Sequence, residues 1–301
     1  MSHDIYQAVT DRIVAELEKG TAPWVKPWKD LRGAGSGPHN AISRRPYSGV
    51  NVLLLWITAA ARGYTSDGWL TFKQVGEAGG HVRKGEKATQ VVFVKPITIS
   101  EKGDDGKPKI DENGDVIEHG AYLMRGYYVF NTEQCDGLPA RATPPGIKNP
   151  DGIAEPAFDD YVARTGAIVK HGGNRACYAP SLDQIAMPVR GAFATPSDYK
   201  ATLLHELSHW TGHKSRLDRN LRNRFGEAEY AMEEMIAEVS AAYLCAELGV
   251  DGKLQHASYI DNWLTVLKKD KKAIFTAASA AQKAADFIRA AASQEAVAVA
   301  A

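Results

Sequence analysis

The segment HELSH, residues 205–209, constrains the fold of this chain more than any other feature of its sequence. Two histidines four residues apart can reach one metal ion when the backbone between them is an α-helix, because a helix places both imidazoles on one face. The surrounding sequence favours a helix: TPSD at 195–198 offers helix-start residues, an apolar stripe precedes the motif, and Gly212 follows as a stop. The pattern therefore predicts a helix over about 196–211 that carries part of a metal site.

The residue types in the motif point to peptidase chemistry. A zinc ion used in catalysis takes three protein ligands and leaves one position open for water. His205 and His209 are expected to be two of the ligands, and Glu206 is placed to take a proton from water that the ion activates. We expect peptide hydrolysis with one Zn²⁺ per chain, with Mn²⁺ or another divalent ion as the alternative. Tyr178 is a candidate for stabilising the oxyanion, although a buried strand tyrosine is the simpler interpretation.

The third ligand has to come from another part of the chain. His213 is nearest in sequence, but a helix that ends at Gly212 turns it away, and the HExxHxxGxxH pattern of metzincins is absent. The helix predicted over about 227–248 contains several glutamates. Glu238 lies beside small alanines at the edge of its apolar stripe, and we expect it to be the ligand. Glu234, one turn earlier, is the alternative ligand or a residue that orients a histidine.

Length and local pattern indicate an α+β protein of two domains. At 301 residues the chain is longer than one compact core usually serves. We expect a small α+β domain over residues 1–135 and a linker over 136–152, where prolines are frequent and no periodicity is visible. Residues 153–301 are expected to form a zincin-like domain, because a few short strands are followed by helices.

The first domain is expected to begin with a helix over residues 4–19, where apolar residues recur every four positions. A second, buried helix should end at Gly63. Two runs rich in β-branched and aromatic residues, at 89–99 and 121–131, predict strands. The polar segment between them, near residues 101–120, should be a long hairpin loop.

Charge is unevenly distributed, although the 36 Lys and Arg residues balance 36 Asp and Glu residues overall. Residues 1–100 hold thirteen Lys or Arg against eight Asp or Glu, so the N-terminal half is the expected nucleic-acid side. Aromatic residues are interleaved with these cations, as single-stranded DNA binding requires, and a core role for them is the equal alternative. The expected DNA-binding residues are Trp24, Lys26, Trp28, Arg44, Arg45, Tyr47, Asn51, Trp69, Phe72, Lys73, Arg83, Lys84 and Lys87.

The three cysteines are odd in number and far apart, as expected for reduced residues of a cytoplasmic protein. The N-terminal helix has no apolar signal core, and no segment reaches about 18 apolar residues. We therefore expect neither secretion nor membrane insertion.

Several longer segments resemble the ArdC antirestriction family. They include SRRPYSGVNVLLLW, GYTSDGWLTFKQVGEAGGHVRKGEKATQVVFVK, CYAPSLDQIAMP, HELSHWTGH and EEMIAEVSAAYLCAEL, and the resemblance covers nearly the whole chain. Family members, carried by conjugative plasmids, join a single-stranded-DNA-binding domain shared with TraC-type primases to a zincin-like metallopeptidase domain. The resemblance implies protection of incoming plasmid DNA from restriction. It also implies His205, Glu206, His209 and Glu238 as the site residues.

Two other functions stay open at this point. A protein that only masks DNA would use the metal for stability, and Glu206→Gln would leave its protection intact. A primase or replication accessory protein would share only the N-terminal module, although no polymerase-like acidic motif or zinc ribbon is evident. The expected partners are single-stranded DNA and a protein substrate, either a restriction-enzyme subunit or another protein.

Overall fold

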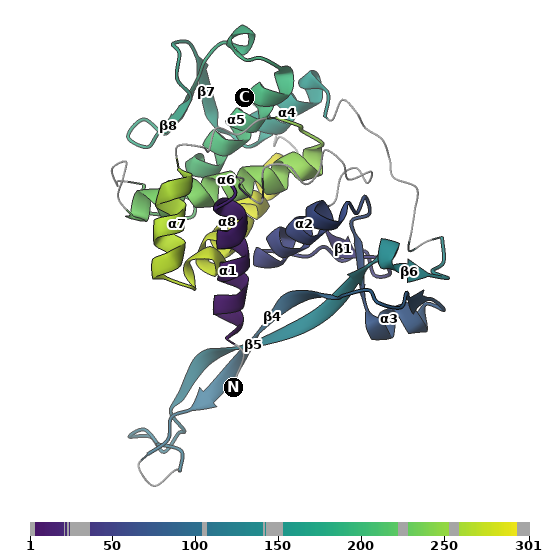
Figure 1. Ribbon diagram of the computed structural model, residues 1–301. Coiled ribbons are helices and arrows are strands. Elements are labelled where there is room, and N and C mark those ends of the chain that lie inside the picture. The colour runs from purple at the N-terminus through teal and green to yellow at the C-terminus, as the bar shows by residue number, and fades with distance from the viewer. Residues whose placement is uncertain are drawn as a thin grey trace.

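The computed structural model describes residues 4–20, 22, 24, 37–103, 107–140, 142, 153–221, 228–252 and 259–293. It confirms an α+β protein with an N-terminal part built on a four-stranded sheet and a C-terminal part built on a small sheet and packed helices (Figure 1). Most of the predicted linker at 136–152 lies outside the described residues, which include only 136–140 and 142 of that segment.

The described residues of the N-terminal part form six strands. They are β1 (His39–Asn40), β2 (Gly68–Thr71), β3 (His81–Val82), β4 (Thr89–Ser100), β5 (Glu118–Asn131) and β6 (Cys135–Asp136). The main sheet has the order β1-β2-β5-β4, and β3 pairs separately with β6. β4 pairs with β5 along its whole length, and the two strands project from the body as a long two-stranded arm (Figure 1). The arm confirms both predicted strands and the polar connection between them.

The helices of this part follow the sequence pattern. α1 (Ile5–Leu17) begins after Asp4, whose carboxylate accepts a hydrogen bond from the backbone N–H of Gln7. α2 (Val50–Arg62) ends at Gly63, which has a φ of 68° that glycine adopts without steric cost. The shorter elements are α3 (Phe72–Glu77) and a 3₁₀ turn at Thr132–Gln134.

The C-terminal part confirms the predicted succession of strands and helices. Its elements are α4 (Glu155–Arg164), β7 (Ile168–His171), β8 (Cys177–Ala179), β9 (Gln184–Met187), a 3₁₀ turn (Arg190–Ala192), α5 (Pro196–Trp210), α6 (Ala228–Leu248), α7 (Ile260–Lys269) and α8 (Ala273–Ser293). The sheet order is β7-β9-β8, with β7 parallel and β8 antiparallel to β9. α6 packs against both α5 and α8. No helix in the described segments is both long and apolar enough to cross a bilayer.

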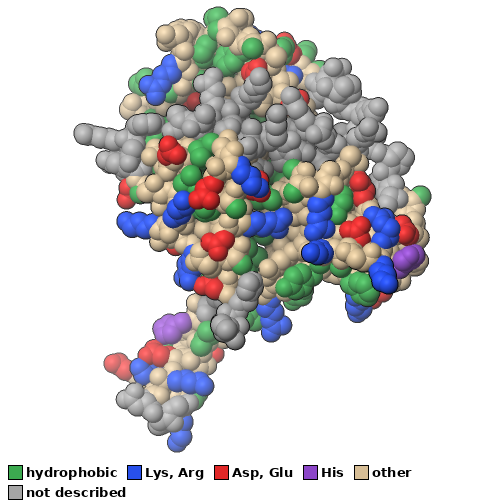
Figure 2. Space-filling model, in the orientation of Figure 1, with side chains coloured by type: hydrophobic (Ala, Val, Ile, Leu, Met, Phe, Trp, Pro, Cys, Tyr) green, Lys and Arg blue, Asp and Glu red, His purple; other side chains and the backbone are tan. Residues whose placement is uncertain are grey.

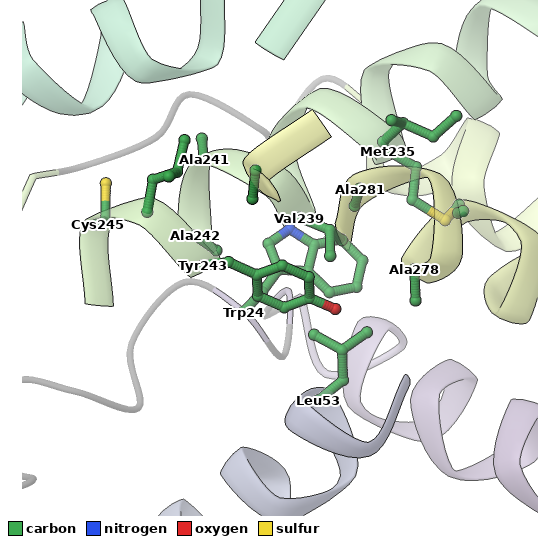
Figure 3. Packing of buried hydrophobic residues seen from close by; sticks show 14 of the residues in the cluster. Trp24, Leu53, Met235, Val239, Ala241, Ala242, Tyr243, Cys245, Ala278 and Ala281 are labelled. Atoms are coloured by element: carbon green, nitrogen blue, oxygen red, sulfur yellow. The ribbon is translucent and has the colours of Figure 1, made fainter. Parts of the chain in front are cut away.

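One hydrophobic core crosses the predicted domain boundary. The rings of Trp24 and Trp263 lie 5.3 Å apart between centroids, and the main buried cluster contains both. Figure 3 shows Trp24 and Leu53, from the N-terminal part, among buried residues of α6 and α8. The Tyr243 hydroxyl on α6 donates a hydrogen bond of 3.0 Å to the backbone carbonyl of Gly49. The two parts are therefore joined by buried contacts as well as by the chain.

Candidate metal centre

α5 presents both histidines of the motif to one point. The helix begins after Thr195, whose hydroxyl accepts a hydrogen bond from the backbone N–H of Asp198. His205 and His209 follow one turn apart, and their Nε2 atoms lie 3.1 Å from each other. Helical spacing alone produces this convergence, as the motif predicts. His213 does not join them: its Nδ1 lies 2.8 Å from the hydroxyl of Ser215.

Glu234 of α6 completes the group. Its Oε2 lies 3.6 Å from Nε2 of His205, and its Oε1 lies 3.6 Å from Nε2 of His209. One ligand atom from each of these three residues lies within 4.8 Å of the other two. Two imidazoles and a carboxylate form the ligand set that catalytic zinc sites use, so the donors present fit a divalent ion.

The preference for Glu238 over Glu234 as third ligand does not agree with this geometry. Oε1 of Glu238 lies 3.9 Å from Nδ1 of His205, the ring nitrogen that points away from His209. Glu234 and Glu238 are one turn apart on the same face of α6, so both approach α5 and their sequence spacing does not distinguish them. Only the angle between α5 and α6 brings Glu234 to the Nε2 side and Glu238 to the Nδ1 side.

The pKa values of the Glu234 and Glu238 carboxyls are shifted in opposite directions. Burial opposes ionisation of Glu234, but the two imidazoles outweigh it and hold the pKa of this carboxyl below its ordinary value. Burial raises the pKa of Glu238 to about 7. The positions of the two carboxyls place Glu234 beside both Nε2 atoms, as a metal ligand requires, and Glu238 beside Nδ1 of His205.

A second carboxylate fixes the orientation of His209. Oε1 of Glu233 lies 3.1 Å from Nδ1 of His209. Arg219 donates hydrogen bonds of 2.9 Å to both carboxylate oxygens of Glu233. It also donates a hydrogen bond of 2.7 Å to the backbone carbonyl of Ser208. Since an ionised Glu233 can only accept, Nδ1 of His209 is the donor, and the lone pair of Nε2 is left for a metal.

The site opens into a cavity of about 970 Å³. Glu206, the expected proton acceptor, lines this cavity and is largely buried. Tyr178, on β8, also lines it, but its hydroxyl donates 2.7 Å to Asp183 and accepts from Arg216 at 3.2 Å. The tyrosine is half-buried rather than fully buried and is held by these contacts, and its role at the oxyanion stays a prediction.

Sequence reasoning assigned no role to Arg219, Tyr230, Glu233 or Tyr259. Tyr230 and Tyr259 line the cavity. The pair of adjacent glutamates at 233 and 234 was the available signal, because two neighbouring carboxylates on a buried helix need cationic partners. Nothing in the local pattern brings Arg219 or Tyr259 to the site, since both arrive through tertiary packing.

The structure divides the expected DNA-binding residues by exposure. Trp24 is 0% exposed and Trp69 is 1% exposed, so neither ring is open to a base in this conformation. Asn51 is engaged, because its amide donates to and accepts from the backbone of Val92 at 2.7 Å, which closes the free edge of β4. Tyr47 is half-buried against the core. The exposed members are Arg44, Arg45, Phe72, Lys73, Arg83, Lys84 and Lys87, whereas Lys26 and Trp28 lie outside the described residues.

Composition could not make this division, because it does not tell a core aromatic residue from a surface one. The exposed aromatic residues of the arm, Phe93, Tyr127 and Tyr128, were not among those expected. The alternation of side chains along the two predicted strands was the signal that could have revealed them.

Two family models together match most of the chain. The N-terminal domain of the anti-restriction factor ArdC matches residues 3–130, and a zincin-like metallopeptidase model matches residues 156–280. Among curated proteins, the chain is 40% identical over 293 residues to the uncharacterized protein y4eC of Sinorhizobium fredii, covering 95% of this chain and 92% of that protein. It is also 40% identical to a DNA primase TraC of Escherichia coli, covering 94% of this chain but only 27% of the primase.

Solved structures give the same result. The metal-free crystal structure of the antirestriction protein ArdC from plasmid R388 aligns with a TM-score of 0.80 and 42% identity, covering 96% of this chain and 98% of that one. The Mn(II)-bound structure of the same protein aligns with a TM-score of 0.78 and 41% identity, covering 97% and 99%. With the likeness extending over both parts and over nearly all of the solved relative, this chain belongs to the ArdC antirestriction family.

Proposed function

We propose that this chain is an antirestriction protein that binds single-stranded DNA through its N-terminal part and hydrolyses a protein substrate at a zinc site in its C-terminal part. It would act in the cytoplasm on incoming plasmid DNA. The observation that carries the enzymatic half is the convergence of His205, His209 and Glu234 beside Glu206 in one cavity. Manganese is the alternative ion, because the R388 relative has a Mn(II)-bound structure.

The residues of the chain have distinct roles in this proposal. A divalent ion held by the two imidazoles and Glu234 would supply positive charge that acidifies water and polarises a carbonyl. Glu206 accepts the proton of the attacking water and passes it to the leaving amine. Glu233 holds the imidazole of His209 through Nδ1, and Glu238, 3.9 Å from Nδ1 of His205, helps to direct the Nε2 atom of that ring toward the same point.

The cavity suits an extended peptide. β8 pairs with β9 on one side, and on its other side no strand of the described residues is paired with it. Cys177 and Tyr178 of this edge strand line the cavity together with the site residues of α5 and α6. A peptide added along β8 would satisfy backbone hydrogen bonds and bring a peptide bond to Glu206. A restriction-enzyme subunit is one protein that such a site would act on.

DNA binding is supported by the match of the N-terminal part to the ArdC domain and by the exposed cations of that part. Arg44, Arg45, Lys84 and Lys87 are candidates for phosphate contacts, because all four side chains are exposed. Arg83 is also exposed, but it is paired with Glu86 and Asp136.

The decisive experiment compares Glu206→Gln with the wild-type protein in conjugation into a recipient that restricts the plasmid. The substitution removes the proton acceptor and leaves the metal donors intact, so metal content should stay at about one ion per chain. We expect the protected transfer frequency to fall to that of a plasmid lacking the gene. Full protection by Glu206→Gln would favour a DNA-masking protein with a structural metal.

Similarity to TraC favours a second candidate, a replication accessory function. The chain spans about a quarter of TraC, so the activity of that whole protein is not transferred to it. Primer synthesis on a single-stranded template by the purified chain would support this candidate over antirestriction.

A further inference from the structure

The arm formed by β4 and β5 has two different faces. Residues paired across the strands share a face, and alternate residues along a strand share a face. Phe93 pairs with Arg125, Lys95 pairs with Leu123, and Tyr127 pairs with Val91. Phe93, Lys95, Leu123, Arg125 and Tyr127 therefore lie on one face, which we call the arm strip.

The arm strip begins where the cover provided by α2 ends. On the same face, Val91 and Val129 are buried against Leu55 and Ala59 of α2. Beyond them, Phe93 is 55% exposed and Tyr127 is 44% exposed, and their rings lie edge to face with centroids 6.0 Å apart. Two large aromatic rings thus remain at the surface although Val91, which pairs with Tyr127, is buried.

The charge of the arm strip has one sign. Lys95 and Arg125 are exposed, and neither has a carboxylate partner among the described residues. The odd-numbered residues of β4 and β5, which make up this face, include no Asp or Glu. Figure 2 shows hydrophobic and basic side chains next to each other beneath the body, where the arm leaves it.

The opposite side of the sheet differs in charge. Phe72 and Tyr128 are exposed aromatic residues there, with Phe72 packed edge to face against Phe130. The neighbouring cation, Lys73, lies 3.5 Å from Glu77. The even-numbered residues of β4 and β5, which lie on this side, include no Lys or Arg, whereas the arm strip has two cations beside its rings.

We infer that the arm strip is the base-stacking surface for single-stranded DNA, an assignment that rests on the proposed function. Phe93 and Tyr127 stack on unpaired bases, and Arg125 and Lys95 contact the adjoining phosphates. Arg125 stands directly across from Phe93 in the register, so one nucleotide meets a ring and a cation together. A polyanion fits this surface better than an apolar protein segment does, because two cations lie within the strip and none of the odd-numbered residues of β4 and β5 is an Asp or Glu.

The test is a fluorescence-anisotropy titration of the full-length, metal-loaded protein with a labelled oligothymidine. Phe93→Ala and Tyr127→Ala should each weaken binding about 5- to 150-fold, the range for losing one stacked base. Arg125→Gln should weaken binding and flatten the dependence of log affinity on log salt by about 0.7, as expected for one lost phosphate contact on a single strand.

Tyr128→Ala is the matched control. It removes an exposed aromatic ring from the next position of the same strand, but on the other face. We expect its affinity to equal that of the wild type. Unchanged thermal unfolding and metal content in all four variants would show that the fold is intact.

Three results would overturn the assignment. Normal binding by Phe93→Ala and Tyr127→Ala, with a loss in Tyr128→Ala or Phe72→Ala, would place DNA on the opposite side of the sheet. A change of oligomeric state in Phe93→Ala, with DNA binding retained, would make the strip a contact between copies of the chain. No single-stranded-DNA binding by the wild-type protein would instead remove the DNA half of the proposed function itself.

Discussion

The metal site and the arm strip differ in how exposed their side chains are and in what positions those side chains. The side chains of His205, His209 and Glu234 are 14%, 13% and 8% exposed, and Glu233 holds the imidazole of His209 through Nδ1. Phe93 and Tyr127 are 55% and 44% exposed and are positioned by the backbone register of two strands. A metal ion used in catalysis needs ligand atoms at fixed positions, whereas an aromatic ring that stacks on a base can adjust its orientation. The predictions below test that contrast, from the largest expected effect to the smallest.

The largest effect should come from removing a donor in the rigid site. His205→Ala deletes one of two imidazoles and leaves a polar cavity, so we expect metal content to fall from about one ion per chain to near zero after dialysis. Elemental analysis measures this directly. Added zinc should raise the unfolding temperature of the wild type but not of the variant, since a ligand that binds only the folded state stabilises it. Full metal occupancy in His205→Ala and in His209→Ala would show that the ion lies elsewhere.

The features that could be predicted from the sequence are those that depend on neighbouring residues of the chain. The helix with His205 and His209 was predictable because ligand spacing and helical period coincide. The strands of the arm were predictable from residue type, and the helix ending at Gly63 from its capping residue. These features are local, and local physical rules are enough for them.

The features that sequence reasoning could not place depend on packing between distant segments. Choosing Glu234 over Glu238 requires the angle at which α6 crosses α5, which no residue spacing encodes. Trp24 was expected to bind DNA, but it packs against Trp263, a residue more than two hundred positions away. Asn51 closes a strand edge through a contact that depends on where α2 lies along β4.

Truncation of a core aromatic residue should lower the free energy of unfolding, whereas truncation of an aromatic residue of the arm strip should leave it almost unchanged. Trp24→Ala empties a fully buried site and should lower the free energy of unfolding by about 3–5 kcal/mol. Tyr127→Ala, at an exposed position, should change it by less than about 0.5 kcal/mol. Urea denaturation measures both. A loss of stability from Tyr127→Ala as large as that from Trp24→Ala would mean that the strip is part of the core.

Weakening the support of His209 should have a smaller effect on the metal site than removing a donor. Glu233→Gln keeps the shape of the side chain but removes the charge that Arg219 and His209 share. We expect metal affinity to fall about 10- to 100-fold, the usual range for a residue that orients a ligand. A competition assay with a chromophoric chelator resolves this range. Glu229→Gln, an exposed change in the first turn of α6, is the matched control and should leave affinity unchanged.

The smallest effect concerns pH and lies in the N-terminal sheet. Burial raises the pKa of Asp67 to about 7 from an ordinary value of 3.8. Folding therefore retains a proton between these values, and the contribution of Asp67 to stability is present below about pH 4 and lost as pH rises through 7. Asp67→Asn should raise the unfolding temperature at pH 8 relative to the wild type, by a gain on the order of 1 kcal/mol, and flatten the pH profile between 4 and 7. An identical pH profile for both proteins would contradict this.

The assignment of Glu234 as the third donor is tested most directly by a chelator titration of Glu234→Ala and Glu238→Ala at neutral pH. Glu234→Ala removes a charge and a bond at the Nε2 side of both imidazoles, so its affinity should fall well beyond 100-fold. Glu238→Ala removes only the group behind His205, so its affinity should fall about 10- to 100-fold. The reverse order, with Glu238→Ala losing the ion and Glu234→Ala retaining it, would contradict the geometry of the site.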